Sequence, residues 1–156
     1  MKGIEKLHPL VRVKAERLLA ICKENGLPII ITQTLRSKEE QDALFAKGRD
    51  TTGNITNKAA VVTYAKYPHS MHCWGLAFDV AREDGKPDES GAKGYYNGDK
   101  FFEQAGAIGR NLGLTWGGDW LTFKDRPHFE DKTIDGAMNA VVKKYGTPDK
   151  FFGTWQ

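Results

Sequence analysis

The sequence has no long hydrophobic run, and this excludes one class of protein at once. Its longest apolar stretches are short, such as Ile29-Ile30-Ile31, whereas a membrane-spanning helix needs about 20 apolar residues. The first residues include no apolar segment of signal-peptide length and no small-residue cleavage site. We therefore expect a protein that is made in the cytosol without a signal peptide and is not inserted in a membrane.

Cysteine is scarce, and charge of one sign is not concentrated anywhere. Cys22 and Cys73 are the two cysteines and lie far apart in the sequence, so we expect free thiols rather than a disulfide. Cys22 falls on an apolar helical stripe and is expected in the core. The net charge is only +3 and its lysines and arginines are scattered, which argues against a nucleic-acid partner.

A length of 156 residues, with 40% hydrophobic and 28% charged side chains, is typical of one soluble domain. Apolar residues recur at helical spacing over 7–24, and Ser37 with Glu40 forms a capping box that predicts a second helix ending near Gly48. Helices come first and short strands follow, with irregular connections, so we predict an α+β fold with a small, mostly antiparallel sheet. The remaining expected elements are helices over 99–112 and 134–145, strands over 27–32, 76–81, 114–116 and 128–130, and loops over 49–69 and 83–98.

His72 and Asp79 are the first candidates for chemistry. Seven residues of straight strand would span roughly 23 Å and point the two side chains to opposite faces. Both can reach one ion only if the chain bends between them, and Gly75 is where a bend is least costly. Asp79 also lies among apolar residues, where a carboxylate needs a cation, an arginine or several N–H donors. We therefore expect His72 in a loop and Asp79 in the strand that follows.

His128 completes a possible metal site. Two imidazoles and a carboxylate form a three-ligand zinc set that leaves a fourth position for water. Asp125 precedes His128 by three residues, with Pro127 fixing the short link between them, and is the candidate general base. Arg36 follows the isoleucine-rich strand, and its guanidinium could reach the oxyanion of a tetrahedral intermediate.

Tryptophans near these residues suggest a cleft. Trp74 and Trp116 are assigned to substrate binding, although Trp74, Trp116 and Trp120 could equally pack in the core. Asp119 could replace Asp125 as the base, but its place beside a pair of glycines is more typical of a turn. Glu130 is expected to face solvent, since it lies beyond His128 at the end of a short strand.

Other polar residues have plainer interpretations than metal binding. His69 could compete for the metal, although a loop histidine in solvent is the simpler expectation. Cys73 directly follows His72 and could also be a ligand, a role that the spacing does not require. A loose acidic cluster could hold calcium, but its spacing fits no known calcium loop; it consists of Asp84, Asp88 and Glu89.

Several spaced motifs together resemble one family. Ser70-x-His72-x-x-Gly75-x-Ala77-x-Asp79, followed by Asp125-x-x-His128, is similar to the signature of the LAS-type zinc peptidases. The L-alanyl-D-glutamate endopeptidases of phage endolysins and some bacilli are the closer branch, because Arg36-Ser37 with Gln41, Leu44 and Gly48-Arg49 matches their N-terminal motif. The resemblance covers roughly 5–132 and includes the 113–120 and 125–129 segments. Cys73-Trp74 departs from it, since Asn or Leu with an aromatic residue is more usual there, and His69 is unusual.

The resemblance implies a site and a fold. It implies one zinc ion on His72, Asp79 and His128, with Asp125 as general base and later proton donor. Arg36 would steady the substrate carbonyl and oxyanion, and Ser70 would lie in the substrate cleft. It also implies the fold of the hedgehog and D,D-peptidase proteins over a single domain, 1–156, on which the tail 133–156 packs.

The resemblance also implies a function. We expect zinc-dependent hydrolysis of an amide bond in the peptide stem of peptidoglycan, at the L-Ala–D-Glu linkage, by a monomer. A phage lysin made in the cytosol would reach the wall through a holin pore. The alternatives are a D,D-carboxypeptidase acting on terminal D-Ala-D-Ala and a non-catalytic, zinc-stabilised wall-binding module, for which Asp125 and Arg36 would be unnecessary.

Overall fold

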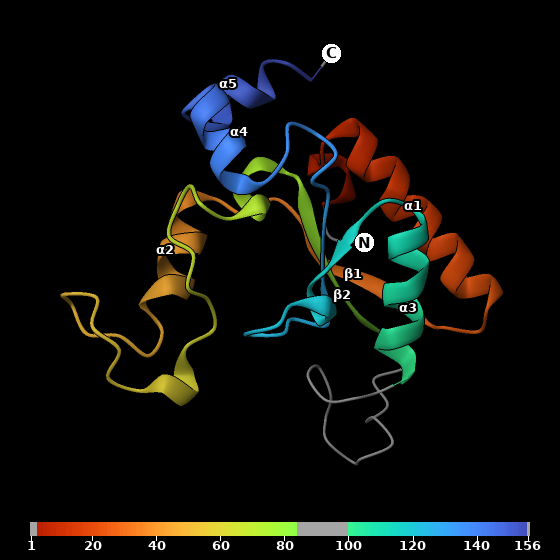
Figure 1. Ribbon diagram of the computed structural model, residues 1–156, viewed down its shortest axis with the longest axis horizontal. Coiled ribbons are helices and arrows are strands. Elements are labelled where there is room, and N and C mark those ends of the chain that lie inside the picture. The colour runs from red at the N-terminus through yellow and green to blue at the C-terminus, as the bar shows by residue number, and fades with distance from the viewer. Residues whose placement is uncertain (1–2, 84–99, 156) are drawn as a thin grey trace.

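The computed structural model describes residues 3–83 and 100–155, and it has the expected α+β architecture (Figure 1). Helices α1 and α3 lie side by side on one side of the sheet, whereas α2 and the long loop after it lie on the other. The helices are α1 (Pro9–Glu24), α2 (Lys38–Ala46), α3 (Lys100–Asn111), α4 (Met138–Tyr145) and α5 (Pro148–Phe152). The strands are β1 (Ile29–Gln33), β2 (Ala77–Arg82), β3 (Thr115–Trp116) and β4 (His128–Glu130). Short 3-10 helices are η1 (Ile4–Lys6), η2 (Lys58–Ala60), η3 (Met71–Trp74) and η4 (Gly117–Asp119).

Helix α2 begins at its predicted cap, whereas α1 begins at Pro9, two residues into the predicted 7–24 segment. Helix α1 has Pro9 at its first position, where a missing N–H costs nothing, and it buries the stripe that includes Cys22. Helix α2 has the predicted capping box: the Ser37 hydroxyl accepts from the Glu40 N–H at 3.1 Å, and the Glu40 carboxylate accepts from the Ser37 N–H at 2.8 Å. The capping box fixes the backbone at the start of α2, and Arg36 directly precedes it.

The sheet formed by the described residues is antiparallel, in the order β1-β2-β4-β3. Strand β2 pairs with β4 so that Asp79 lies directly opposite His128. A register irregularity between Ile31 and Gln33 interrupts the β1–β2 ladder next to Asp79. The prediction of a small antiparallel sheet is confirmed, and the two inner strands carry two of the three candidate ligands.

Close packing between α3 and the sheet explains two glycines within a helix. A Cβ at Gly106 would lie 2.4 Å from the Trp116 ring, and one at Gly109 would lie 2.4 Å from the Phe129 ring. Phe129 stacks in turn on Phe78 with ring centroids 5.6 Å apart. The aromatic core therefore reaches from α3 to the face of β2 and β4, beneath the candidate site.

The C-terminal part differs from expectation. The last predicted helix, 134–145, begins only at Met138, because Asp135 and Gly136 have φ angles of 58° and 86°, which a right-handed helix cannot contain. A further short helix, α5, follows and buries Phe151. The predicted loop 83–98 and the expected helix start at Asp99 lie almost wholly outside the described residues. In the part of the chain that is described, no helix has the length and apolarity to cross a membrane.

Candidate metal centre

A turn between η3 and β2 brings His72 toward Asp79. Gly75 ends η3 with a φ of 65°, and its N–H donates to the His72 carbonyl at 3.3 Å. A Cβ there would lie 2.6 Å from the Trp155 ring and 2.9 Å from the Lys6 carbonyl oxygen. Both the backbone conformation and the crowding therefore require glycine. The bend predicted at Gly75 is confirmed, with His72 before the strand and Asp79 within it.

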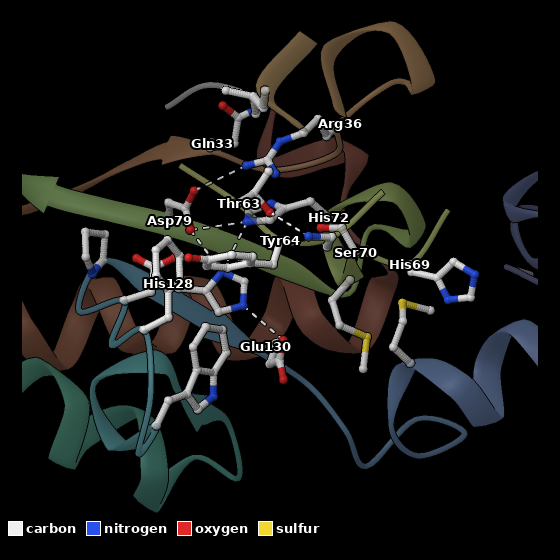
Figure 2. A pocket seen from close by; sticks show the side chains of 18 of the residues that line it. Gln33, Arg36, Thr63, Tyr64, His69, Ser70, His72, Asp79, His128 and Glu130 are labelled. Atoms are coloured by element: carbon white, nitrogen blue, oxygen red, sulfur yellow. Dashed lines mark hydrogen bonds and ion pairs between the residues drawn. The ribbon is translucent and has the colours of Figure 1, made fainter. Parts of the chain in front are cut away.

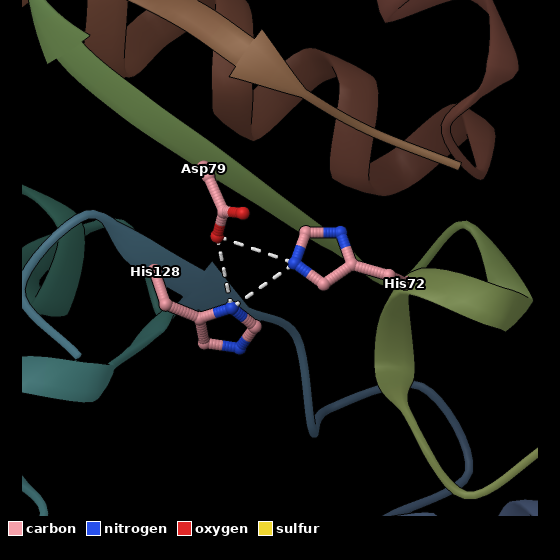
Figure 3. Close-up of side chains that lie close together, drawn as sticks. All are labelled: His72, Asp79 and His128. Carbon is pink, nitrogen blue, oxygen red and sulfur yellow. Dashed lines mark hydrogen bonds and ion pairs between the residues drawn. The ribbon is translucent and has the colours of Figure 1, made fainter. Parts of the chain in front are cut away.

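Three side-chain atoms converge beyond this turn (Figure 3). Asp79 Oδ1 lies 3.2 Å from His72 Nε2 and 3.1 Å from His128 Nδ1, and the two nitrogens are 3.2 Å apart. Atoms that bind one zinc ion at about 2.0–2.1 Å in a tetrahedron lie about 3.3 Å from each other. The observed separations therefore match the edges of a single tetrahedral site.

The outer nitrogens of the two imidazoles show why this convergence suits a cation. His72 Nδ1 lies 2.7 Å from the Thr34 carbonyl oxygen, and His128 Nε2 lies 3.0 Å from Glu130 Oε2. Both outer partners are acceptors, so in each neutral ring they hold the single proton on the outer nitrogen. Two lone pairs and a carboxylate oxygen then face one another with no proton between them. Such a donor set fits a metal ion, which would be bound by His72, Asp79 and His128.

The charges around the triad also favour a cation. Burial alone would raise the pKa of Asp79, but the charge of His72 and the hydrogen bonds of both histidines hold that pKa well below its usual range. Burial alone would lower the pKa of His128, but hydrogen bonds and charge from Asp79 and Glu130 raise it to about 10. Two carboxylates next to one imidazole thus attract positive charge, whether as a proton or as a metal.

Arg36 is fixed beside the triad from two directions. Its Nη2 lies 3.7 Å from Asp79 Oδ2, and its Nη1 donates to Gln41 Oε1 at 2.9 Å. Its backbone N–H donates to the His72 carbonyl at 3.0 Å, and the Gln41 amide donates to the Ala65 carbonyl at 2.6 Å. Only 10% of the Arg36 side chain is exposed. The guanidinium therefore points from the start of α2 toward the metal site, as Figure 2 shows.

Asp125 and the triad line the same cavity. Its backbone carbonyl accepts from the His128 N–H at 3.2 Å, and its N–H donates to the Gly117 carbonyl at 3.0 Å. A Cβ at Gly117 would lie 2.3 Å from the Asp125 carbonyl oxygen, so the close approach of these segments needs glycine. Among the described residues, the Asp125 carboxylate has no hydrogen-bonding partner. Burial raises its pKa, although the charge of His128 opposes that effect.

The triad lies in a cavity of about 870 Å³ that is drawn in part in Figure 2. Its lining includes both candidate catalytic residues, Arg36 and Asp125, together with Ser70 from the loop before η3. Tyr64 and Phe123 also line the cavity, and their rings are nearly perpendicular with centroids 5.0 Å apart. The structure thus brings the candidate metal ligands, the candidate base Asp125, the Arg36 guanidinium and Ser70 into one cleft.

Two tryptophans predicted to bind substrate do not reach this cleft. Trp74 is fully buried and donates to the Pro68 carbonyl at 2.7 Å. Trp116 is 5% exposed, donates to the Arg126 carbonyl at 2.7 Å and packs against α3. The assignment of Trp74 and Trp116 to substrate contact was therefore wrong, because both rings pack in the core. Trp120 lines the cleft instead, with its ring 5.1 Å from that of His128.

Glu130 corrects another expectation. It was predicted to face solvent, but it is only 7% exposed, lines the cleft and pairs with His128. Burial alone would raise its pKa, but the hydrogen bond and charge of His128, with those of Lys132, lower it. Alternate residues of a strand share a face, so the spacing of His128 and Glu130 was a usable signal.

The remaining candidates lie away from the triad. Asp119 pairs with Arg110 at the surface, with both carboxylate oxygens within 2.9 Å of Nη1, as suits a residue of a turn. His69 is exposed and points away from the three ligands in Figure 2. Cys22 and Cys73 are buried free thiols, and burial raises the pKa of each to about 11. The acidic cluster at Asp84, Asp88 and Glu89 lies outside the described residues.

Comparison with known proteins identifies the family of this chain. The sequence profile of an M15 peptidase family described as D-alanyl-D-alanine carboxypeptidase matches residues 63–131, which contain all three candidate ligands. The peptidoglycan L-alanyl-D-glutamate endopeptidase CwlK of Bacillus subtilis is 40% identical over 127 residues, covering 80% of this chain and 72% of CwlK. The chain belongs to the M15 peptidase family.

Two further proteins resemble this M15 peptidase. The L-alanyl-D-glutamate peptidase of Listeria phage A118 is 31% identical over 130 residues, which cover 83% of this chain but only 40% of the phage protein. A crystal structure of the vancomycin-resistance D,D-pentapeptidase VanY in complex with Zn(II) has a TM-score of 0.57 at 16% identity, covering 94% of this chain and 83% of that one. The latter similarity establishes the fold alone.

Proposed function

We propose that this M15 peptidase is a zinc-dependent endopeptidase that hydrolyses the L-Ala–D-Glu bond in the peptide stem of peptidoglycan. One observation carries the proposal: three atoms that can bind a metal converge in a cleft that also contains a fixed guanidinium and the half-buried carboxylate of Asp125, which has no hydrogen-bonding partner among the described residues. A site for binding alone would need only the first of these groups. The choice of bond is supported by the names of the Bacillus subtilis and phage relatives.

We infer that a single zinc ion is held by His72 Nε2, Asp79 and His128 Nδ1. When bound, zinc would polarise the scissile carbonyl and lower the pKa of a water molecule to about 7. The histidine and aspartate donor set fits zinc, and three protein ligands leave room for substrate and water. The separations between the three ligand atoms, 3.1–3.2 Å, leave space for one ion.

Asp125 is proposed as the general base and acid. Its carboxylate is free to accept a proton from the water that attacks the carbonyl carbon. The raised pKa of Asp125 makes this carboxyl a better proton acceptor than an ordinary aspartate. The same carboxyl then donates that proton to the departing amine, so one residue both accepts and returns the proton.

Arg36 is proposed to stabilise the negative charge that develops on the carbonyl oxygen. A guanidinium that is held by Gln41 and Asp79 before substrate binds does not need to reorganise during the reaction. Ser70 and Trp120 line the same cleft and are proposed to contact the stem peptide.

Two alternative functions are cleavage of a different peptidoglycan bond and wall binding without catalysis. D,D-carboxypeptidase activity on terminal D-Ala-D-Ala is favoured by the description of the matching family. A non-catalytic wall-binding module would leave Asp125 and Arg36 without a use. The phage relative supports a phage origin, for which we propose release through a holin pore, and the bacterial relative supports a bacterial enzyme of the wall.

Digestion of purified peptidoglycan tests the proposal. Zinc-loaded protein, chelated protein and the Asp125→Asn variant are compared, and the products are identified by mass spectrometry. We expect released peptides with N-terminal D-Glu and glycan that retains L-Ala, both lost on chelation. Asp125→Asn should lower the rate by about 10²- to 10⁴-fold while its zinc affinity stays near that of the wild type.

Other products would support one of the alternative functions. Release of D-Ala alone would replace the endopeptidase by the D,D-carboxypeptidase. Binding to several wall types without any zinc-dependent product would favour the non-catalytic module.

A further inference from the structure

Glu130 is a buried carboxylate with both oxygens engaged. Oε2 lies 3.0 Å from His128 Nε2, and Oε1 lies 3.0 Å from Lys132 Nζ. Only 9% of the Glu130 side chain is exposed, whereas 42% of the Lys132 side chain is exposed. A buried carboxylate is stable only when it is paired, and here one partner is a candidate ligand and the other a surface cation. Figure 2 shows Glu130 next to His128, on the side away from Asp79.

The contact determines which nitrogen of His128 is available to a metal. A neutral imidazole has one proton, and a carboxylate next to Nε2 retains that proton there. Nδ1 then presents a lone pair toward Asp79 Oδ1 and His72 Nε2, at 3.1 Å and 3.2 Å. Without Glu130, the Nε2–H tautomer would lose this acceptor, and the alternative tautomer has its proton on Nδ1, where it opposes metal binding.

The His128 ring is also held in orientation. The Trp120 ring lies 5.1 Å from it at an angle of 48°, and Glu130 fixes the edge that faces away from the site. His72 has a different arrangement, because its outer nitrogen faces the uncharged Thr34 carbonyl. Of the two imidazoles, only His128 has a carboxylate behind it, and a carboxylate makes an imidazole a stronger donor to metal.

We propose that Glu130 is a positioning residue for the metal site, and that Lys132 holds Glu130 in place. The proposal rests on the zinc site of the proposed function and deepens it. Lys132 pairs with the second oxygen and so fixes the carboxylate in the orientation in which Oε2 faces His128 Nε2. A direct role as base does not suit Glu130, since both its oxygens are paired whereas the Asp125 carboxylate has no partner among the described residues.

Zinc affinity measured without substrate tests the proposal. Wild type, Glu130→Ala, Glu130→Gln and Lys132→Met are titrated against a chromogenic zinc chelator at fixed pH. Asp119→Ala is the matched control, since it removes a paired carboxylate that lies outside the cleft. We expect Glu130→Ala to bind zinc about 10- to 100-fold more weakly. Glu130→Gln should lose less, because its amide oxygen can still accept from Nε2–H, and Lys132→Met should fall between Glu130→Gln and the control.

Two additional readouts separate positioning from catalysis and from folding. Saturating zinc should restore most of the hydrolysis rate of Glu130→Gln, whereas replacement of a general base would not be rescued. ¹⁵N NMR of the zinc-loaded wild type should show metal on Nδ1 of His128 and a proton on Nε2. If Glu130→Ala does not fold, the affinities of Glu130→Gln and Lys132→Met decide the question.

The possible failures are distinguishable. Zinc affinities of both Glu130 variants within twofold of the wild type would overturn the positioning role and leave the proposed function intact. A wild type that binds no zinc would overturn the positioning role together with the zinc site on which the function depends.

Discussion

Asp79 and Asp125 face the same cleft, yet their surroundings move their pKa values in opposite directions. The histidines outweigh burial at Asp79 and keep its carboxylate charged, whereas burial dominates at Asp125 and favours the neutral acid. Two carboxylates with separated pKa values can perform different tasks at one pH. Asp79 suits a permanent metal ligand, and Asp125 suits a group that gains and loses a proton in each turnover.

The raised pKa of Asp125 predicts the acid limb of the pH profile. A base must be deprotonated, so kcat/KM falls as the pH decreases through that pKa. Because burial raises the pKa of Asp125, the limb should lie above the value of about 3.9 that is usual for aspartate. The measurement is kcat/KM against pH at two saturating zinc concentrations.

The second zinc concentration is the control. Protonation of metal ligands also abolishes activity at low pH, but a limb of that origin moves to lower pH when zinc is increased. A limb independent of zinc belongs to Asp125. A zinc-independent limb at or below the usual aspartate value would contradict the raised pKa.

At the scale of elements, the turn between η3 and β2 determines whether the ligands can meet. Gly75 allows the chain to reverse between His72 and Asp79, and the space where a Cβ would lie is already filled by Trp155 and the Lys6 carbonyl. The turn thus depends on contacts from both ends of the chain. Gly75 is therefore part of the motif because the turn requires glycine, and not because it takes part in catalysis.

The substitution Gly75→Ala should destabilise the protein more than Gly26→Ala. Both glycines have left-handed φ angles, 65° and 70°, but nothing lies within 4 Å of a Cβ at Gly26. Gly26→Ala should therefore cost about 1–2 kcal/mol for the backbone alone, and Gly75→Ala should cost more because the methyl overlaps its neighbours. Urea unfolding of the two variants gives the comparison. Equal losses of unfolding free energy would mean that the Trp155 ring moves aside without any cost in stability.

Local sequence signals predicted the elements that depend on local physics. The capping box at Ser37 and the helical stripe through Cys22 are decided by neighbouring residues, and the bend at Gly75 uses a left-handed conformation that glycine itself permits. The ligand spacing could also be interpreted, because a buried aspartate and two histidines have few other uses. Position in the sequence also made Asp125 the candidate base and Arg36 the candidate for the oxyanion, and the family resemblance implied the same two roles.

Features decided by distant parts of the chain were not predictable in this way. Whether the face of β4 that carries Glu130 meets water or a cleft depends on which segments cover it, and the cover comes from residues far away in sequence. The choice between core and cleft for Trp74 and Trp120 has the same origin. The late start of α4 follows from the left-handed conformations of Asp135 and Gly136, which aspartate adopts less often than glycine but more often than most other residues.

At the scale of the whole molecule, the C-terminal segment packs on the part of the chain that carries His72. The Phe151 ring lies 5.8 Å from Trp74 and 5.6 Å from His8, and α5 contacts η3. Residues after 133 therefore contribute to the same core as the metal site. We propose that 1–156 forms one domain in which this tail is a structural part.

Phe151→Ala should cost about 3–5 kcal/mol of the free energy of unfolding, as expected for removal of a fully buried aromatic ring. Phe151 is 1% exposed, whereas the neighbouring Phe152 is only partly buried and serves as the control. Denaturant unfolding measures both variants, and Phe152→Ala should lose distinctly less. Similar small losses for both would indicate that the tail is not needed for the stability of the domain.

The position of the ligands on the inner strands also has an evolutionary consequence. Asp79 and His128 lie opposite each other in the β2–β4 ladder, whereas much of the cleft wall comes from irregular segments around 62–70 and 120–127. Loops accept insertions and replacements far more readily than paired strands. A lineage with this architecture could therefore acquire a new cleavage preference by exchanging wall loops, while the inherited metal set and its hydrogen-bonded frame remain unchanged.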